Sequence, residues 1–145
     1  MSWVAKVRSD AYDFVGAIPA IAALTETDLI ESQLPPVIER QDLTQREIAV
    51  FVDTAETTLA SRHCRTRSFA VWITIVEPLK QGQEDTQIEA NQLLVDAIEQ
   101  AALGVRLGGD ANGVVTGFEQ TVVLSPKHWN EFRQYASYIK LTVEV

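Results

Sequence analysis

The C-terminal stretch of the chain alternates apolar and polar side chains with a period of two, which is the pattern of a half-buried β-strand. From position 135 onward, one face would carry Tyr135, Ser137, Ile139, Leu141, Val143 and Val145, and the other Ala136, Tyr138, Lys140, Thr142 and Glu144. An unpaired strand edge promotes association, so this strand must pair within its own sheet or with a neighbouring subunit. We expect it to close the sheet of its own domain, with Ile139, Leu141 and Val143 inward and Tyr138 and Lys140 outward.

Two further strands are predicted by runs of β-branched and aromatic residues, Ile48 to Asp53 and Phe69 to Glu77. We expect them to pair as a hairpin. The polar segment between them, Thr54 to Ser68, is too long for a tight turn and predicts a projecting arm or mobile loop. The second run is apolar on both faces. Trp72 therefore faces either an internal two-sided core or another subunit.

The helices are predicted by apolar residues at helical spacing. The first runs from Ser2 to about Gly16 and breaks near Pro19. The second runs from Gln87 to Leu103, because Thr86 and Glu89 form a capping-box pattern ahead of an apolar stripe. That stripe consists of Ile88, Asn91, Val95, Ile98 and Ala102.

The remaining segments connect these elements. Thr25 to Asp42, with Pro35-Pro36, predicts an extended connector with a possible edge strand. Five of the seven glycines lie from Gly104 to Gly117, a turn-rich link before a strand at Phe118 to Leu124. Ser125-Pro126 predicts a short helical turn through about Phe132. We therefore expect an α+β fold in a single domain, 1–145, with a mixed or antiparallel sheet of about four strands, two main helices and a long projecting hairpin loop.

Composition and charge exclude several classes of protein. The net charge of −8 disfavours a protein that wraps nucleic acid, since phosphate binding needs clustered Lys and Arg. A single cysteine gives no disulfide framework of the secreted kind. Asp10 and Asp13 interrupt the region where a signal peptide would need an apolar core. The longest apolar stretch, Phe14 to Leu24, is shorter than the roughly 20 residues that cross a bilayer. We expect cytoplasmic synthesis and no membrane partner.

Candidate reaction chemistry is sparse, and we predict no enzyme, no cofactor and no metal. A closed zinc site needs four ligands, and the chain has only His63, Cys64 and His128 as histidine or cysteine ligands. A catalytic Cys–His pair needs a third residue that orients the histidine, and the sequence indicates none. Asp53, Glu77 and Lys80 faintly suggest a metal-dependent nuclease. In such enzymes, however, the second acid and the lysine are one residue apart on a strand, whereas Pro78 and Leu79 intervene here.

The order of these segments resembles that of small phage and prophage proteins of the head-to-tail joining region, the tail terminator and tail completion group. The resemblance covers the chain from about Leu34 to the end. It is carried by IAVFV, FAVWITIVEP, IEANQLLVDAIEQAAL and, most specifically, LSPKHWNEFRQYASYIKLTV. It implies a structural virion protein, made in the host bacterial cytoplasm, that forms a ring, commonly a hexamer. Such a ring caps the finished tail tube and provides the surface on which the head docks.

The implied partners are further copies of the chain, the tail tube protein and head-completion or connector proteins, with DNA only passing through the lumen. A head-completion or minor tail protein of the same region, a small metal-dependent hydrolase and a monomeric adaptor remain alternatives. A ring subunit needs two different complementary patches. Our candidates are Trp72 and Val76 for one patch, Arg62, Arg65 and Arg67 on the arm for a tube or ring contact, and the outward Tyr138 and Lys140. The alternative for the arginines is an ordinary solvated loop.

Overall fold

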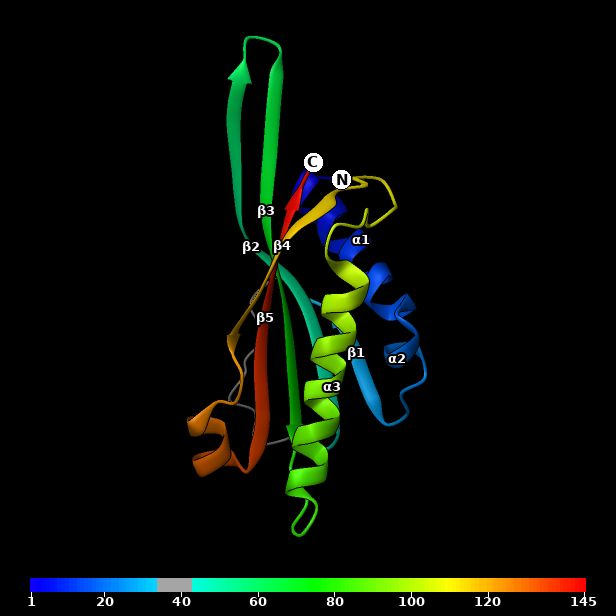
Figure 1. The fold of residues 1–145 in the computed structure, drawn as a ribbon, viewed down its shortest axis with the longest axis vertical. Coiled ribbons are helices and arrows are strands. Elements are labelled where there is room, and N and C mark those ends of the chain that lie inside the picture. The colour runs from blue at the N-terminus through cyan, green and yellow to red at the C-terminus, as the bar shows by residue number, and fades with distance from the viewer. Residues whose placement is uncertain (34–42) are drawn as a thin grey trace.

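Three of the helices pack against one face of a five-stranded mixed sheet in the computed structural model, which describes residues 1–33 and 43–145 (Figure 1). The strands are β1 (Thr27–Glu31), β2 (Arg46–Ser61), β3 (Cys64–Pro78), β4 (Val114–Val122) and β5 (Gln134–Glu144), in the spatial order β1-β2-β3-β5-β4. The helices are α1 (Trp3–Ala17), α2 (Pro19–Ala22), α3 (Glu84–Ala102) and a π-helical turn, η1 (His128–Phe132). β1 runs parallel to β2, and the other neighbours are antiparallel. The α+β prediction is confirmed, with five strands instead of about four.

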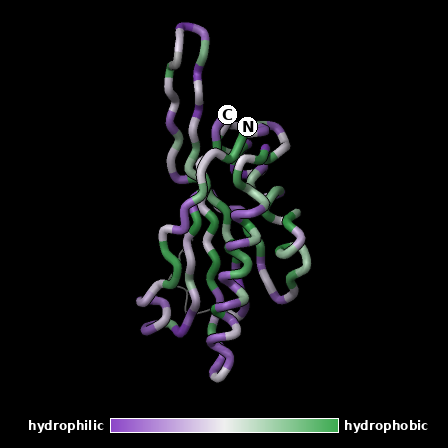
Figure 2. Tube along the Cα trace, in the orientation of Figure 1, coloured by the Kyte–Doolittle hydropathy of each residue, from purple (hydrophilic) through white to green (hydrophobic). Residues whose placement is uncertain are grey.

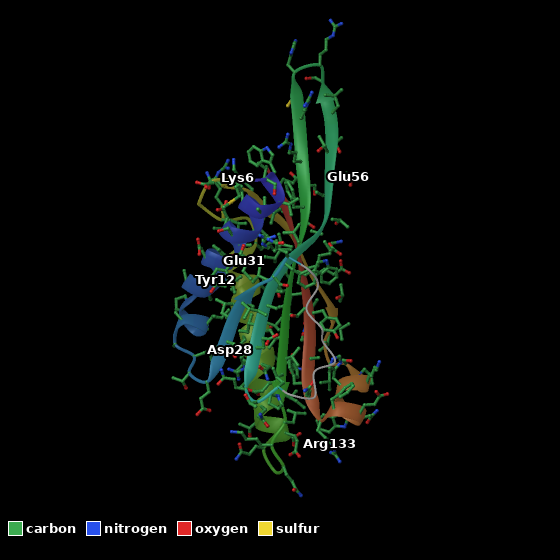
Figure 3. The ribbon with its side chains drawn as sticks, turned by 180° about the vertical axis from the view of Figure 1, so that it is seen from behind. Lys6, Tyr12, Asp28, Glu31, Glu56 and Arg133 are labelled. Carbon is green, nitrogen blue, oxygen red and sulfur yellow. The ribbon has the colours of Figure 1, made fainter. Side chains whose placement is uncertain are left out.

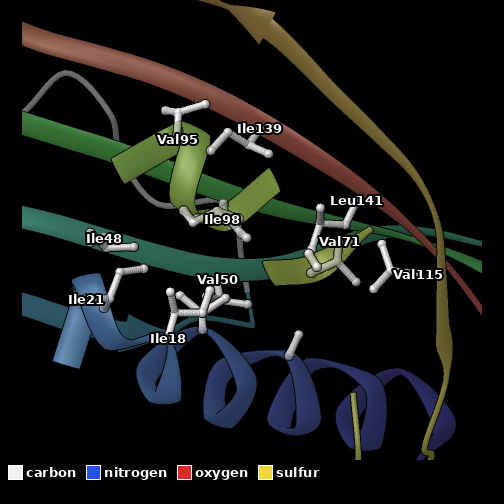
Figure 4. Close-up of a cluster of buried hydrophobic side chains, with 14 of the residues drawn as sticks. Ile18, Ile21, Ile48, Val50, Val71, Val95, Ile98, Val115, Ile139 and Leu141 are labelled. Atoms are coloured by element: carbon white, nitrogen blue, oxygen red, sulfur yellow. The ribbon is translucent and has the colours of Figure 1, made fainter. Parts of the chain in front are cut away.

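The core lies between the sheet and the helices α1 and α3 (Figure 4). Alternate residues of the central strands enter it, among them Ile48 and Val50 of β2, Val71 and Ile73 of β3, and Ile139 and Leu141 of β5. The predicted inward side chains Ile139, Leu141 and Val143 are fully buried. β5 lies between β3 and β4, so both of its edges are paired within the domain. The C-terminal strand is therefore not the edge through which a neighbour would pair.

The N-terminal third follows the sequence pattern. The Ser2 hydroxyl caps α1 by accepting from Ala5 N at 3.1 Å, and Pro19 occupies the first turn of α2, where its missing N–H costs nothing. The expected edge strand forms as β1 and is held by α1, since Tyr12 Oη donates to Leu29 O at 3.3 Å and Arg8 pairs with Glu31 at 2.8 Å (Figure 3). Pro35-Pro36 lies outside the described residues.

The second helix begins earlier than its capping pattern predicts. α3 starts at Glu84 after the N-cap residue Gln83, whose side chain makes no capping hydrogen bond. Thr86 and Glu89 therefore lie inside the helix, and the predicted capping box is wrong. Glu84 and Asp85 occupy the first turn instead, where their negative charge is favoured by the helix dipole. The helix ends at Ala102, one residue before the predicted end, and Gly104 follows with φ +81°.

The later strand and turn are close to prediction. β4 spans Val114–Val122, beginning four residues before the expected Phe118. The helical turn after Pro126 closes when Trp129 N donates to Ser125 O at 3.1 Å. It then widens into η1 and ends at Arg133, whose φ is +51°.

A polar cluster interrupts the core where α3 crosses the sheet. Asn91 is fully buried, accepts from Arg46 Nε at 2.9 Å through Oδ1, and donates to Glu77 Oε1 at 3.1 Å through Nδ2. Arg46 and Glu77 also form an ion pair of 3.1 Å, with only 11% and 14% of their side chains exposed. Gln87 donates to Glu77 Oε1 at 3.1 Å. The cluster therefore fixes α3 against β2 and β3 through directional contacts.

Asp10 connects α1 to the glycine-rich link that precedes β4. Asp10 is 6% exposed, and its carboxylate accepts the backbone N–H groups of Asp110, Ala111 and Asn112 at 3.1, 2.8 and 3.1 Å. Gly108 and Gly109, at φ +79° and +74°, form the preceding turn, as their predicted role requires. One buried side chain thus organises a loop a hundred residues later in the chain.

Tyr135 offers a test of the core at alkaline pH. Burial raises the pKa of its phenol above the ordinary value of 10.0, and the neighbouring Ser137 hydroxyl offsets part of that rise without meeting the geometry of a hydrogen bond. As the pH rises, the phenol therefore ionises in the unfolded chain before it ionises in the folded protein. The stability that the buried neutral phenol contributes is intact below about pH 10 and is lost as the pH rises through the folded pKa. No described residue offers the phenol oxygen a hydrogen bond in good geometry. Tyr135→Phe should change the free energy of unfolding by less than about 1 kcal/mol at pH 7. It should also flatten the alkaline decline in urea titrations run from pH 8 to 11; an unchanged decline would contradict the assignment.

Candidate assembly surface on the hairpin arm

β2 and β3 continue beyond the body of the sheet as a two-stranded arm, Thr54 to Arg67 (Figure 1). The strands stay paired out to Ser61 and Cys64, which flank a two-residue turn of Arg62 and His63. The projecting arm is confirmed, but the expectation that this segment is too long for a tight turn was wrong. Threonines along both strands favour extended backbone, so the polar segment pairs as strand. A register shift between Val52 and Thr54, at the base of the arm, marks a bulge of the kind that bends and twists a ribbon.

The base of the arm is attached to the body on one side. Arg67 lies over the Trp3 ring at 4.9 Å, and Lys6 lies over the same ring at 4.8 Å. Arg67 and Val145 also exchange two backbone hydrogen bonds of 3.3 and 2.8 Å. Figure 3 shows Lys6 and Glu56 at the same level, on opposite sides of the lower part of the arm. The Arg67 side chain therefore packs on the protein's own N-terminal helix.

The outer part of the arm is hydrophilic (Figure 2). Its residues 61–65 are exposed and include the basic side chains Arg62 and Arg65. Arg62 and Arg65 make no ion pair with any described residue. Leu59 lies directly across from Arg65 in the register and is 64% exposed. Cys64, the only cysteine of the chain, is free and exposed beside the turn. The tip thus combines two uncompensated positive charges with one apolar side chain.

The other predicted contact residues gather on the sheet face that points away from α1 and α3. Trp72 is half-buried, stacks on Phe51 at 6.5 Å, and lies across from Lys140 in the register. Its buried indole Nε1 has no hydrogen-bond partner in the part of the chain that the structure describes. Tyr138 is half-buried against the His128 ring at 6.4 Å. Val76, however, is only 8% exposed and adds little surface.

The residues considered for catalysis are not brought together. Asp53 is exposed at the bulge of β2, while Glu77 lies six residues beyond the facing part of β3, about 20 Å away at the rise of a strand. Glu77 is instead paired with Arg46. His63 and Cys64 are at the arm tip, whereas His128 is buried with Nδ1 2.8 Å from Ser125 Oγ. Within the described ranges, no three His, Cys, Asp or Glu side chains are grouped to hold a metal ion.

Open hollows on the described part of the surface include the following three. One, of about 490 Å³, adjoins the arm base and includes Thr66, Arg106 and Glu144 in its lining. The second, of about 410 Å³, is lined by Leu79, Gln81, Glu84, Trp129 and Arg133, and the third, of about 240 Å³, by Ile88, Leu124, Pro126, Trp129 and Asn130. The linings of these three hollows hold no nucleophile next to a base and no paired carboxylates.

The sequence interpretation did not single out two strongly exposed leucines, Leu59 on the arm and Leu93 on α3. Leu93 is 58% exposed on the outer face of the helix. The exposure of Leu93 could have been predicted from the sequence, because helical spacing places it outside the apolar stripe that contains Val95 and Ile98. Leu59 could not be placed, since the arm was taken as a loop without alternating faces.

No protein-family model matches the chain, and no curated protein matches it. Among the described residues, none of the helices has the length and apolar character needed to cross a membrane.

Proposed function

We propose that this chain is a structural protein of the head-to-tail joining region of a phage. Several copies of it would form the tail terminator ring, which caps the tail tube. The resemblance of LSPKHWNEFRQYASYIKLTV to that group of proteins supports the proposal. This stretch, Leu124 to Val143, forms the β4–β5 connection with η1 and all of β5 except its last residue. β5 is the strand that holds β3 and β4 together. The most specific part of the resemblance therefore lies in a segment central to the fold.

The observation that carries the proposal is the arm. An isolated two-stranded ribbon is only marginally stable in water, and stable ribbons pack a face on something else. Between Phe69 and the tip, the arm's described side chains are exposed or half-buried. Such an extension adds no core to its own domain, and a partner surface would complete it. A ring of identical subunits supplies that surface once per copy.

The alternatives differ in their support. A head-completion or minor tail protein of the same region would use the same arm. A monomeric adaptor would use it as well, and differs by having no contact between copies. The nuclease alternative loses support because Asp53 and Glu77 are far apart and Glu77 is neutralised by Arg46.

Removing the arm tip tests the proposal. Thr58 and Thr66 face each other, so replacing residues 59–65 by Asn-Gly closes a shorter hairpin with a two-residue turn. The shortened chain should keep its circular dichroism spectrum and its melting temperature within about 3 °C, since the removed residues contribute no core. It should form no higher oligomer in native mass spectrometry and no rings on tail tubes in electron micrographs.

The control is Cys64→Ser, which keeps the length and charge of the arm and should assemble normally. Rings that form equally well without the tip would show that the arm is not the contact. An intact chain that stays monomeric at every concentration, and leaves tail tubes uncapped, would overturn the proposed function itself.

A further inference from the structure

The outer face of α3 is acidic along its whole length. The helix contains five acidic residues and no basic residue. Asp85, Glu89, Asp96 and Glu99 are exposed. Like charges three or four positions apart repel each other and destabilise a helix. This face is therefore electrostatically unfavourable in an isolated subunit.

An exposed leucine lies in the middle of these carboxylates. Leu93 is 58% exposed, four positions after Glu89 and three before Asp96. Residues at that spacing share one stripe of a helix. The outer face of α3 thus presents an apolar centre with a carboxylate on either side.

The arm carries the complementary arrangement. Leu59 and Arg65 face each other across the ribbon, so they share one face of it, and Arg62 is at the turn. The same chain therefore has an exposed leucine with arginines at one site, and an exposed leucine between carboxylates at another.

We propose that the outer arm of one copy docks across the outer face of α3 in a second copy. Leu59 would pack on Leu93, while Arg65 and Arg62 would pair with the carboxylates beside it. The inference rests on the proposed assembly of several copies and names the surfaces that form it. The arm cannot reach α3 of its own copy, because it projects from the body in the direction away from the start of that helix (Figure 1).

The two surfaces are different, so the contact is heterologous and joins copies head to tail. Repetition of such a contact produces a closed ring or an open filament. Apolar packing at the centre excludes water, and the surrounding ion pairs set orientation and discriminate against wrong partners. Because the charges are exposed in the free subunit, salt should weaken association.

Charge reversal tests the pairing. Arg62→Glu/Arg65→Glu and, separately, Glu89→Arg/Asp96→Arg should each weaken association about tenfold or more in sedimentation velocity, because each sets like charges against one another. The chain carrying all four substitutions should recover association, since both surfaces are then reversed. The control is Asp13→Arg/Asp28→Arg, at two other exposed acids. It makes the same change in net charge as Glu89→Arg/Asp96→Arg and should have little effect on association. Failure of the fourfold variant to recover, or equal weakening by the control, would overturn the proposal.

The chain's single cysteine allows the partner surface to be located directly. A benzophenone maleimide on Cys64 should photocross-link to peptides of α3, Glu84–Ala102. In a mixture of ¹⁴N- and ¹⁵N-labelled protein, the cross-linked pairs should include mixed-isotope products, which only two copies can give. Oligomers whose Cys64 cross-links to another element would overturn this contact and leave the ring intact. A protein with no mixed-isotope product and no oligomer would overturn both.

Discussion

Glu77→Ala is expected to lower the free energy of unfolding by about 3–5 kcal/mol, because it leaves the Arg46 guanidinium buried without its counter-charge. Arg46 and Glu77 are 3.1 Å apart with most of both side chains removed from water. Asn91 and Gln87 would each lose an acceptor as well. Urea denaturation followed by circular dichroism measures the change, and the midpoint should fall with little change in the slope.

Glu119→Ala is the matched control, since it removes an exposed strand carboxylate and should change stability by no more than about 0.5 kcal/mol. A double-mutant cycle with Arg46→Ala separates the pair from its surroundings. The double variant should lose less than the sum of the two single variants, because neither charge is then left alone. A Glu77→Ala variant as stable as the wild type would mean that water reaches this cluster.

The cluster of Arg46, Glu77 and Asn91 shows what the spacing of apolar residues can and cannot predict. Asn91 lies on the stripe that faces the sheet, and the spacing correctly predicts that it is buried. The spacing does not reveal that Asn91 joins an arginine from β2 to a glutamate from β3, because those residues are 45 and 14 positions away. Only the register of β2 with β3 sets the two charges side by side.

The arm shows a different limit. Its polar composition predicts exposure correctly, and exposure was equated with a loop. Paired strands with both faces in water also have polar side chains on both faces, so period two disappears. The turn gave no signal, since Arg62-His63 lacks the Gly or Asn typical of two-residue hairpins. The threonines along the arm were the available indication of strand.

Strand order was the least accessible property. The sequence predicts that β5 is a half-buried strand, and the pattern is the same for a central as for an edge strand. Its place between β3 and β4 depends on long-range pairing, such as Ile73 with Ile139. The parallel pairing of β1 with β2 likewise depends on contacts such as that of Leu29 with Ile48, which no local pattern reveals. Local patterns therefore specify the elements, and tertiary contacts specify their neighbours.

Gly109→Ala is expected to destabilise the protein by about 3 kcal/mol or more, through the loop that Asp10 holds. Gly109 has φ +74°, which costs an L-residue about 1 kcal/mol. Its new Cβ would overlap Asp10 Oδ1 and lie 2.5 Å from Cγ. The carboxylate is buried and accepts three backbone N–H groups, so it cannot move aside without breaking charge-assisted hydrogen bonds worth about 1.5 kcal/mol or more each.

Gly108→Ala is the matched control for backbone strain. Gly108 has φ +79°, and nothing lies within 4 Å of the position that its Cβ would take. It should therefore cost only the roughly 1 kcal/mol of the left-handed conformation. Hydrogen exchange separates the two effects, because the amides of Asp110, Ala111 and Asn112 should exchange faster in Gly109→Ala than in Gly108→Ala. Equal destabilisation by the two alanines, with equal protection of these amides, would mean that the loop yields to the new methyl group and that Asp10 does not hold it.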